Sequence, residues 1–261
     1  MSKIEEALKK MQAARAQVDS TAPAGDAQPA PAAEPAAARP SAAKGSVHER
    51  IVAFHHPGTA LTETFKQFNT VIRSMSQGTV TTLAFTSAMK GEGKSVIALN
   101  FAVALAFDCE GSVCVVDGDL RNPSLHHLLG LPNDRGFADV LSGDLTLSNV
   151  VSPTPVEKLF FVPAGRTTGN SSELFSSRRA AQAVAELRER YDYTIFDTAP
   201  ILPAADTIHL SSRLDGVVVV IHAGRTHRKQ ARRAVELLGH ANVLGFILNK
   251  SEREETAKDY V

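Results

Sequence analysis

A glycine-rich octapeptide constrains the fold of this chain more than any other feature: Ala88-Met89-Lys90-Gly91-Glu92-Gly93-Lys94-Ser95. An apolar, β-rich run precedes it at 80–86, and an Ala- and Leu-rich run of helical composition follows it at 95–107. This order of strand, glycine-rich turn and helix is the context that a P-loop, or Walker A motif, requires. It predicts a βα unit of a parallel sheet, with the octapeptide at the carboxyl end of the strand.

The residue types of this loop suit the binding of phosphate groups. Gly91 and Gly93 allow the backbone to turn so that N–H groups point inward around phosphate oxygens. The helix that begins near Lys94 adds the positive end of its dipole. The Lys94 ammonium can reach the β- and γ-phosphates, and the Ser95 hydroxyl can ligate Mg²⁺. The loop therefore predicts a site for ATP and Mg²⁺ built by Met89, Lys90, Gly91, Glu92, Gly93, Lys94, Ser95 and Val96, although Ala88 replaces the usual first glycine.

Two further apolar runs end in carboxylates. Asp117 and Asp119 follow the run 113–116, and Asp197 follows the run 193–196. An aspartate at the end of a buried strand is unfavourable unless a cation or a hydrogen-bond donor meets it. Mg²⁺ beside a triphosphate is such a cation, although a single aspartate in this position is more often a helix cap or a turn former. We predict that Asp117 and Asp197 join the loop hydroxyl as metal ligands, and that Asp117 or Asp119 acts as a general base.

Strand and helix patterns alternate along the chain after about residue 47. Further strands are expected at 159–162, 216–221 and 243–248, and further helices at 171–190, 204–213 and 226–238. Runs that are apolar at every position are buried on both faces of a sheet. The pattern therefore predicts an α/β fold of the P-loop NTPase type, a three-layer sandwich whose mostly parallel sheet carries helices on both faces.

Composition divides the chain into four parts. The pattern of residues 1–20 predicts an amphipathic helix. Its apolar side would dock on a partner, on another copy or on a lipid surface; the alternative is a solvated tail. Residues 21–46 are an Ala/Pro-rich linker with too little apolar bulk to fold. Residues 47–250 are the expected catalytic domain, and 251–261 are a tail.

Charge and hydropathy narrow the range of partners. The chain has 28 basic and 28 acidic residues, a balance that does not support a bulk nucleic-acid binder. No apolar run approaches the length of a membrane span, so we expect a cytoplasmic protein that reaches a membrane through a partner. Cys109 and Cys114 lie in apolar stretches without partners at metal-ligand spacing, and we expect them to be buried thiols.

Three segments together resemble the bacterial tyrosine kinases, which are P-loop kinases that accompany polysaccharide synthesis and export: AMKGEGKS, VVDGDLRNPSLHHLLG and YDYTIFDTAPILPAADTIHL. The resemblance implies ATP hydrolysis, tyrosine autophosphorylation, assembly with other copies and activation by a membrane-bound polysaccharide co-polymerase, or chain-length determinant. By analogy, Lys94 and Ser95 take the Walker A role and Asp197 takes the Walker B role. Asp117 and Asp119 lie on the second, family-specific Walker motif. The implied catalytic residues are thus Lys94, Asp117, Asp119 and Asp197.

The sequence departs from the family pattern at two places that bear on function. The family usually ends in a cluster of tyrosines, whereas the tail here has only Tyr260, which we predict as the phosphoacceptor. The family helix that packs subunits carries a Glu and two Arg at three-residue spacing. Here the matching residues are Glu63, Lys66 and Asn69, so the bidentate pairing of arginine is lost.

The alternative function is an ATPase switch of the Min/Par type. Such a switch would bind and hydrolyse ATP to control a membrane partner without tyrosine phosphorylation. These proteins usually have a signature lysine five positions before the P-loop lysine, where this chain has Met89, and this difference favours the kinase. A scaffold without activity is disfavoured by the intact P-loop and strand-end acids. We also expect Asn249, directly after the last strand, to contact the adenine base.

Overall fold

The computed structural model describes residues 45–75, 78–166 and 170–251. The predicted N-terminal helix, the linker up to residue 44, and the tail with Tyr260 lie outside these described residues.

The described part of the chain forms one seven-stranded sheet with the order β3-β4-β2-β5-β1-β6-β7. All neighbouring strands are parallel except the β3–β4 pair, which is antiparallel. The strands are β1 (Thr82–Ser87), β2 (Val113–Gly118), β3 (Ser152–Pro153), β4 (Leu159–Val162), β5 (Tyr193–Thr198), β6 (Gly216–His222) and β7 (Val243–Asn249).

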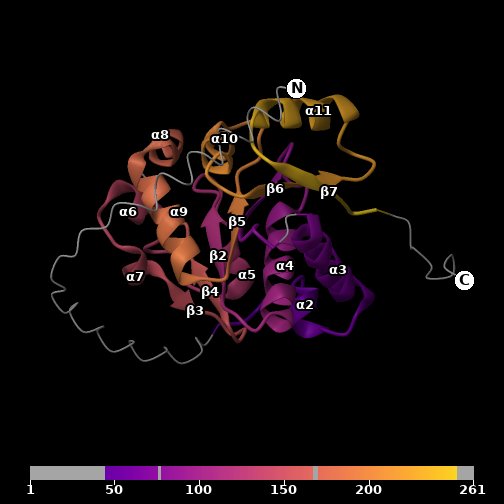
Figure 1. The fold of residues 1–261 in the computed structure, drawn as a ribbon, viewed down its shortest axis with the longest axis horizontal. Helices are drawn as coiled ribbons and strands as arrows, with labels where there is room; N and C mark the ends of the chain where they lie inside the picture. Colours follow the sequence, from indigo (N-terminus) through magenta and orange to yellow (C-terminus); the bar gives the residue numbers. More distant parts are fainter. Residues whose placement is uncertain (1–44, 76–77, 167–169, 252–261) are drawn as a thin grey trace, which may run out of the picture. The chain divides into compact units, whose positions relative to one another are not determined.

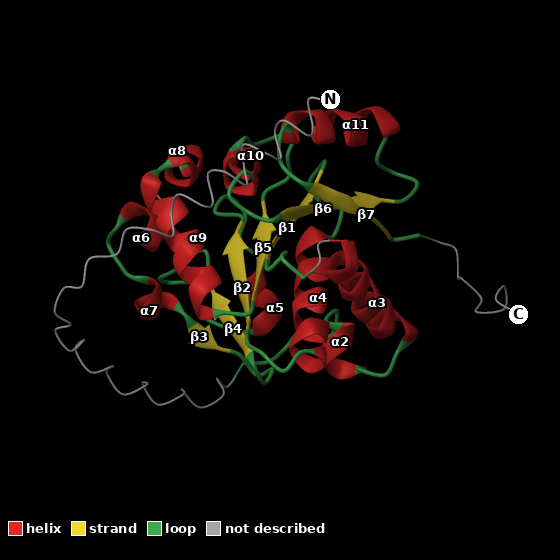
Figure 2. Ribbon diagram, in the orientation of Figure 1, coloured by secondary structure: helices red, strands yellow, loops and turns green. Residues whose placement is uncertain are grey.

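Helices cover both faces of this sheet, as the apolar runs predicted (Figures 1 and 2). One face carries α2 (Val52–His55), α3 (Ala60–Met75), α4 (Lys94–Asp108) and α5 (Leu125–Leu129). The other carries α6 (Phe137–Ser142), α7 (Leu147–Val150), α8 (Ser171–Ser176), α9 (Arg178–Arg190), α10 (Asp206–Ser211) and α11 (Arg228–Leu238). The three-layer α/β sandwich is confirmed.

Successive side chains of each strand point to opposite faces of the sheet, and they form one hydrophobic core on each face. Leu83 and Phe85 of β1 pack against the α4 side, while Ala84, between them, faces the opposite side. All six residues of β1 are buried, because helices cover the sheet above and below. The Phe85 ring lies 5.2 Å from the Phe101 ring of α4, so the helix that follows the glycine-rich loop packs directly against β1.

One predicted helix is wrong. The pattern at 171–190 predicts a single helix, but the chain breaks at Ser177 between α8 and α9. The Ser177 hydroxyl oxygen accepts the N–H of Ala180 and caps α9, with the backbone of Ser177 in an extended conformation. Periodicity cannot reveal such a break when the apolar positions on both sides still follow a helical spacing.

The prediction of buried thiols is confirmed for Cys114, whereas Cys109 is only half-buried; both are free thiols. Among the described residues, no helix combines the length and the apolar character that crossing a membrane demands.

Candidate active site

The glycine-rich loop joins the end of β1 to the start of α4, as predicted. Its two glycines adopt left-handed backbone conformations, with φ of +86° at Gly91 and +94° at Gly93. Side chains other than glycine rarely adopt such values. At Gly93 space is also excluded, since a Cβ atom would collide with the Asn249 side-chain amide. The backbone conformation therefore favours glycine at this position, and a larger residue would also have to displace the Asn249 amide.

The Lys94 ammonium lies among carboxylates from the ends of two other strands. Its Nζ atom is 2.8 Å from Asp119 Oδ2, 3.2 Å from Asp197 Oδ1 and 3.2 Å from the Ser95 hydroxyl oxygen. Because β2, β5 and β1 are neighbours in the sheet, residues about 100 positions apart in sequence meet at one edge. The structure thus brings Lys94, Ser95, Asp119 and Asp197 into direct contact.

Asp117 joins this cluster through the strand register, because it is the parallel partner of Asp197 in the β2–β5 pair. Its Oδ2 atom accepts the N–H groups of Ser124, at 2.9 Å, and Leu125, at 3.0 Å. Its Oδ1 atom accepts the N–H of Asp119 at 3.3 Å. Asp117, at the end of β2, therefore supports the segment between β2 and α5, which is a structural role that strand-end aspartates commonly have.

Burial and mutual repulsion set the charges of this cluster. Burial raises the pKa of Asp197 above its usual value, against the attraction of Lys94. Burial and the nearby Asp197 charge raise the pKa of Asp117 to about 8, although the N–H of Leu125 opposes the shift. Burial lowers the pKa of Lys94, but the carboxylates of Asp197 and Asp119 outweigh this effect and the net shift is upward. An additional cation at this edge would relieve the repulsion between the acids.

The oxygen atoms at this edge suit a magnesium ion bound with a phosphate ligand. Asp197 Oδ2 is buried and has no hydrogen-bond partner, and Lys94 Nζ lies 3.2 Å from both Asp197 Oδ1 and the Ser95 hydroxyl oxygen. No three carboxylate, histidine or cysteine side chains converge on one ion position within residues 45–75, 78–166 and 170–251. Mg²⁺ usually takes one or two carboxylates and completes its shell with waters and substrate phosphates. The donor set Ser95, Asp117 and Asp197 fits such an ion.

Asn249 lies beside the loop, at the end of β7. Its Nδ2 atom donates to the carbonyl oxygen of Glu92 at 2.8 Å, and Lys250 Nζ donates to the carbonyl of Gly91 at 3.0 Å. The Glu92 carboxylate accepts the N–H of Met89, at 2.9 Å, and the Thr226 hydroxyl. The Met89 N–H is therefore engaged within the loop.

Sequence reasoning did not identify Thr226 and Lys250. They lie 134 and 159 positions from their partners in the loop, and no local pattern marks them. It also did not identify Arg121, which forms a two-point ion pair with Asp206 at 2.7 and 3.1 Å. This ion pair connects the segment after Asp119 to α10. It therefore helps to hold in place the chain that follows the acidic residues at the end of β2.

The three residues of α3 that match the family's subunit-packing helix make contacts within this chain. On α3, Lys66 pairs with Glu63 at 2.7 Å, while Asn69 is buried. The glutamate that matches the family's subunit-packing helix is thus engaged by its own chain.

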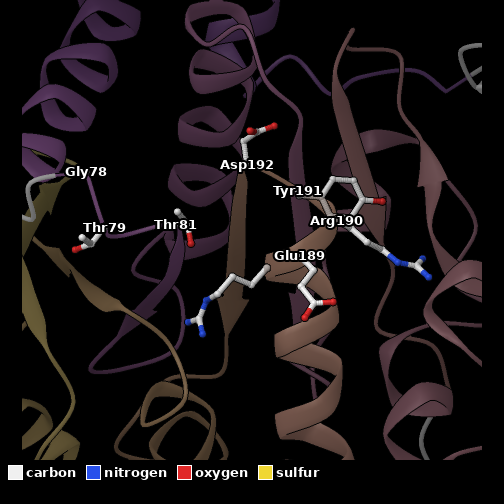
Figure 3. A pocket seen from close by; sticks show the side chains of 8 residues that line it. Gly78, Thr79, Thr81, Glu189, Arg190, Tyr191 and Asp192 are labelled. Atoms are coloured by element: carbon white, nitrogen blue, oxygen red, sulfur yellow. The ribbon is translucent and has the colours of Figure 1, made fainter. Parts of the chain in front are cut away.

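An open pocket lies at the opposite edge of the sheet, near the amino ends of β1 and β5 (Figure 3). It is lined by Gly78, Thr79, Thr81, Arg188, Glu189, Arg190, Tyr191 and Asp192. Both arginines of the pocket are already paired, Arg188 with Asp215 at 2.7 Å and Arg190 with Glu186 at 2.6 Å, which leaves little free positive charge for an anion. Ligands of open α/β sheets bind at the carboxyl edge, and we therefore do not assign the nucleotide to this pocket.

Comparison with known proteins gives a consistent set of relatives. The ParA family model, described as NUBPL iron-transfer P-loop NTPase, matches residues 79–258. The chain is 30% identical over 222 residues to the putative tyrosine-protein kinase CapB of Staphylococcus aureus, covering 84% of this chain and 97% of CapB. It is 34% identical over 210 residues to the tyrosine-protein kinase YwqD of Bacillus subtilis (strain 168), covering 79% and 88%.

A longer relative and a relative of known structure are similar to the chain over most of its length. The chain is 30% identical over 208 residues to the succinoglycan biosynthesis transport protein ExoP of Rhizobium meliloti (strain 1021). That match covers 77% of this chain but only 26% of ExoP. The crystal structure of the chimerical protein CapA2B2 superposes with a TM-score of 0.75 at 29% identity, covering 80% of this chain and 94% of the chimera chain.

Proposed function

Because the chain belongs to the bacterial tyrosine-protein kinases, within the P-loop NTPases, we propose that it is a Mg·ATP-dependent protein-tyrosine autokinase that regulates exopolysaccharide biosynthesis and export. The observation that carries this proposal is the contact of the Lys94 ammonium with Asp119 and Asp197 at the end of a glycine-rich loop. Relatives that act in polysaccharide systems, such as ExoP, support the biological setting.

The loop would hold the phosphates of ATP, and the ion pairs of Lys94 would rearrange when the phosphates bind. Lys94 moves from Asp119 toward the β- and γ-phosphates, while the main-chain N–H groups of Gly91 and Gly93 donate to phosphate oxygens. Ser95, Asp117 and Asp197 would hold Mg²⁺, which supplies charge neutralisation on the phosphoryl group when bound. Catalysis then rests on positioning and electrostatics, without a covalent enzyme intermediate.

The acceptor tyrosine needs a base for its proton. Asp119 Oδ2 is the better candidate, because it loses its partner once Lys94 turns to the phosphates, whereas the Asp117 carboxylate would hold Mg²⁺ and also accepts main-chain N–H groups. Asp119 takes the proton from the tyrosine Oη. A bond forms between Oη and the γ-phosphorus as the bond to the β,γ-bridging oxygen breaks, and ADP leaves.

The acceptor is Tyr260 of another copy of the chain, and the activator is a membrane-bound polysaccharide co-polymerase. The protein then acts in the cytoplasm at the inner face of the plasma membrane through that partner. The partner is supported by the relation to ExoP, most of which lies outside the matched region.

Phosphotyrosine mapping tests the proposal. Purified protein is incubated with Mg·ATP and analysed by mass spectrometry, beside the Lys94→Ala and Tyr260→Phe variants. We expect phosphate on Tyr260 that is absent from both variants. A mixture of the two variants should restore label on the Lys94→Ala chain, because one variant retains the catalytic site and the other retains the acceptor.

The second candidate is an ATPase switch of the Min/Par type, favoured by the single tyrosine of the tail and by the ParA family model. ATP hydrolysis that depends on Lys94 but leaves no phosphotyrosine would replace the kinase with this switch. A native chain that neither binds nor hydrolyses Mg·ATP would contradict both functions.

A further inference from the structure

Three side chains contact the outside of the glycine-rich loop, and all three come from the carboxyl edge of β6 and β7. We call Thr226, Asn249 and Lys250 the outer brace. Thr226 precedes α11, Asn249 ends β7, and Lys250 follows it. The Thr226 hydroxyl donates to the Glu92 carboxylate, Asn249 Nδ2 donates to the Glu92 carbonyl at 2.8 Å, and Lys250 Nζ donates to the Gly91 carbonyl at 3.0 Å.

The planarity of the peptide bond gives these contacts a direction. In a trans peptide the C=O of one residue and the N–H of the next point to opposite sides. Donors on the Gly91 and Glu92 carbonyls therefore leave the N–H groups of Glu92 and Gly93 pointing away from the outer brace. The Gly93 N–H meets no hydrogen-bond acceptor among the described residues. It remains available for an anion on the inner side of the loop.

The loop needs such support because its own backbone is permissive. Gly91 and Gly93, with φ of +86° and +94°, can reach many other conformations. Donation to a carbonyl also polarises its peptide group and strengthens the N–H on the other side as a donor. The outer brace thus both orients the loop and improves its grip on phosphate.

The backbone of the outer brace is itself shaped for this contact. Lys250 is one of two non-glycine residues with positive φ among the described residues, at +59°, a value uncommon outside glycine. Its N–H donates to Asn249 Oδ1 at 2.9 Å, so the amide oxygen faces Lys250 and the Nδ2 group faces the loop. Gly93 lies so close to this amide that even a methyl group would collide with it.

We propose that Asn249 and its neighbours in the outer brace are positioning residues for polyphosphate binding: they act on the phosphates through the main chain of Gly91, Glu92 and Gly93. This inference rests on the proposed function, since it concerns the same nucleotide site. It differs from the expectation that Asn249 contacts adenine, because a positioning residue affects the binding of phosphates that carry no base.

Inorganic tripolyphosphate separates the two roles. Binding of Mg·ATP and of tripolyphosphate with Mg²⁺ is measured by calorimetry on the full chain and on the variants Asn249→Ala and Lys250→Met. A lost hydrogen bond of ordinary strength predicts about three- to ten-fold weaker binding of both ligands. Lys250→Gln, which keeps a donor without the charge, should recover part of the loss.

The matched control is Asn242→Ala. Asn242 Nδ2 also donates to a main-chain carbonyl, that of Asp215 at 2.8 Å, but at the opposite end of β7. This variant should bind both ligands like the native chain, and thermal unfolding of all variants identifies any general loss of folding.

Each other outcome has a definite meaning. If Asn249→Ala weakens Mg·ATP but leaves tripolyphosphate unchanged, Asn249 contacts the base and the positioning role is wrong. If Asn249→Ala and Lys250→Met bind both ligands normally, the outer brace has no functional effect. If the native chain binds neither ligand, the proposed function itself is overturned, and the outer brace loses its ligand with it.

Discussion

Replacement of Lys94 by methionine is expected to destabilise the nucleotide-free protein and to make its stability depend strongly on pH. The Lys94 side chain is only 10% exposed, and Asp119 and Asp197, its partners at 2.8 and 3.2 Å, are 4% and 0% exposed. Methionine keeps most of the length of the side chain and removes the charge. The buried carboxylates then lack a cation, a change that typically costs about 3–5 kcal/mol.

Protonation of one of the buried carboxyl groups limits this loss of stability. Neutralising one carboxyl of ordinary pKa at pH 7 costs about 4 kcal/mol, because each pKa unit corresponds to about 1.4 kcal/mol. For the roughly 200 described residues, an unfolding entropy of about 2 cal/mol/K per residue gives about 0.4 kcal/mol per degree. A loss of about 3–5 kcal/mol therefore lowers Tm by about 7–12 °C at pH 7.

The sign of the pH dependence follows from the direction of the pKa shifts. Burial raises the pKa of Asp197, and burial with Asp197 raises that of Asp117 to about 8. A carboxyl whose pKa rises on folding favours the folded state below its ordinary pKa, and this contribution is lost as pH rises through the folded pKa. Without Lys94 these pKa values rise further, so the gap in Tm between variant and native protein should narrow from pH 8.5 to pH 5.5.

Differential scanning calorimetry in the presence of EDTA measures this gap. Lys66→Met is the matched control, because Lys66 makes a solvent-exposed ion pair with Glu63, and such pairs contribute little to stability. Equal shifts of Tm in the two variants, or a gap that does not change with pH, would refute the reasoning.

Two further substitutions test the sheet and the loop. Asp215→Ala removes the acceptor of both N–H groups and both hydroxyls at residues 81–82, and should lower the free energy of unfolding by about 2–4 kcal/mol in urea. Burial opposes ionisation of Asp215, but these donors lower its pKa, so the native advantage over Asp215→Ala should shrink as pH falls below about 4. Gly93→Ala should weaken Mg·ATP binding more than ten-fold, because φ is +94° and the new Cβ meets Asn249. Gly239→Ala, also at positive φ but with open space around it, should bind normally in the same titration.

The sequence by itself determined the sheet type, the glycine-rich loop and the strand-end acids. Each of these depends on short-range chemistry: Gly91 and Gly93 are required by local backbone conformation, and β1 and β2 are buried at every position because helices cover both faces. The position of the aspartates at the carboxyl edge follows from parallel strand geometry alone.

Only the tertiary structure decided how these parts support one another. The strand order places β5 between β1 and β2, so that Lys94 meets both Asp119 and Asp197. The tertiary structure also shows that Asp117 accepts main-chain N–H groups of the segment after β2. It shows too that Asn249 binds the glycine-rich loop at Glu92, 157 positions away in the sequence. Such contacts leave no periodic trace in sequence, because a single polar side chain satisfies them and its partner is a main-chain group that every residue possesses.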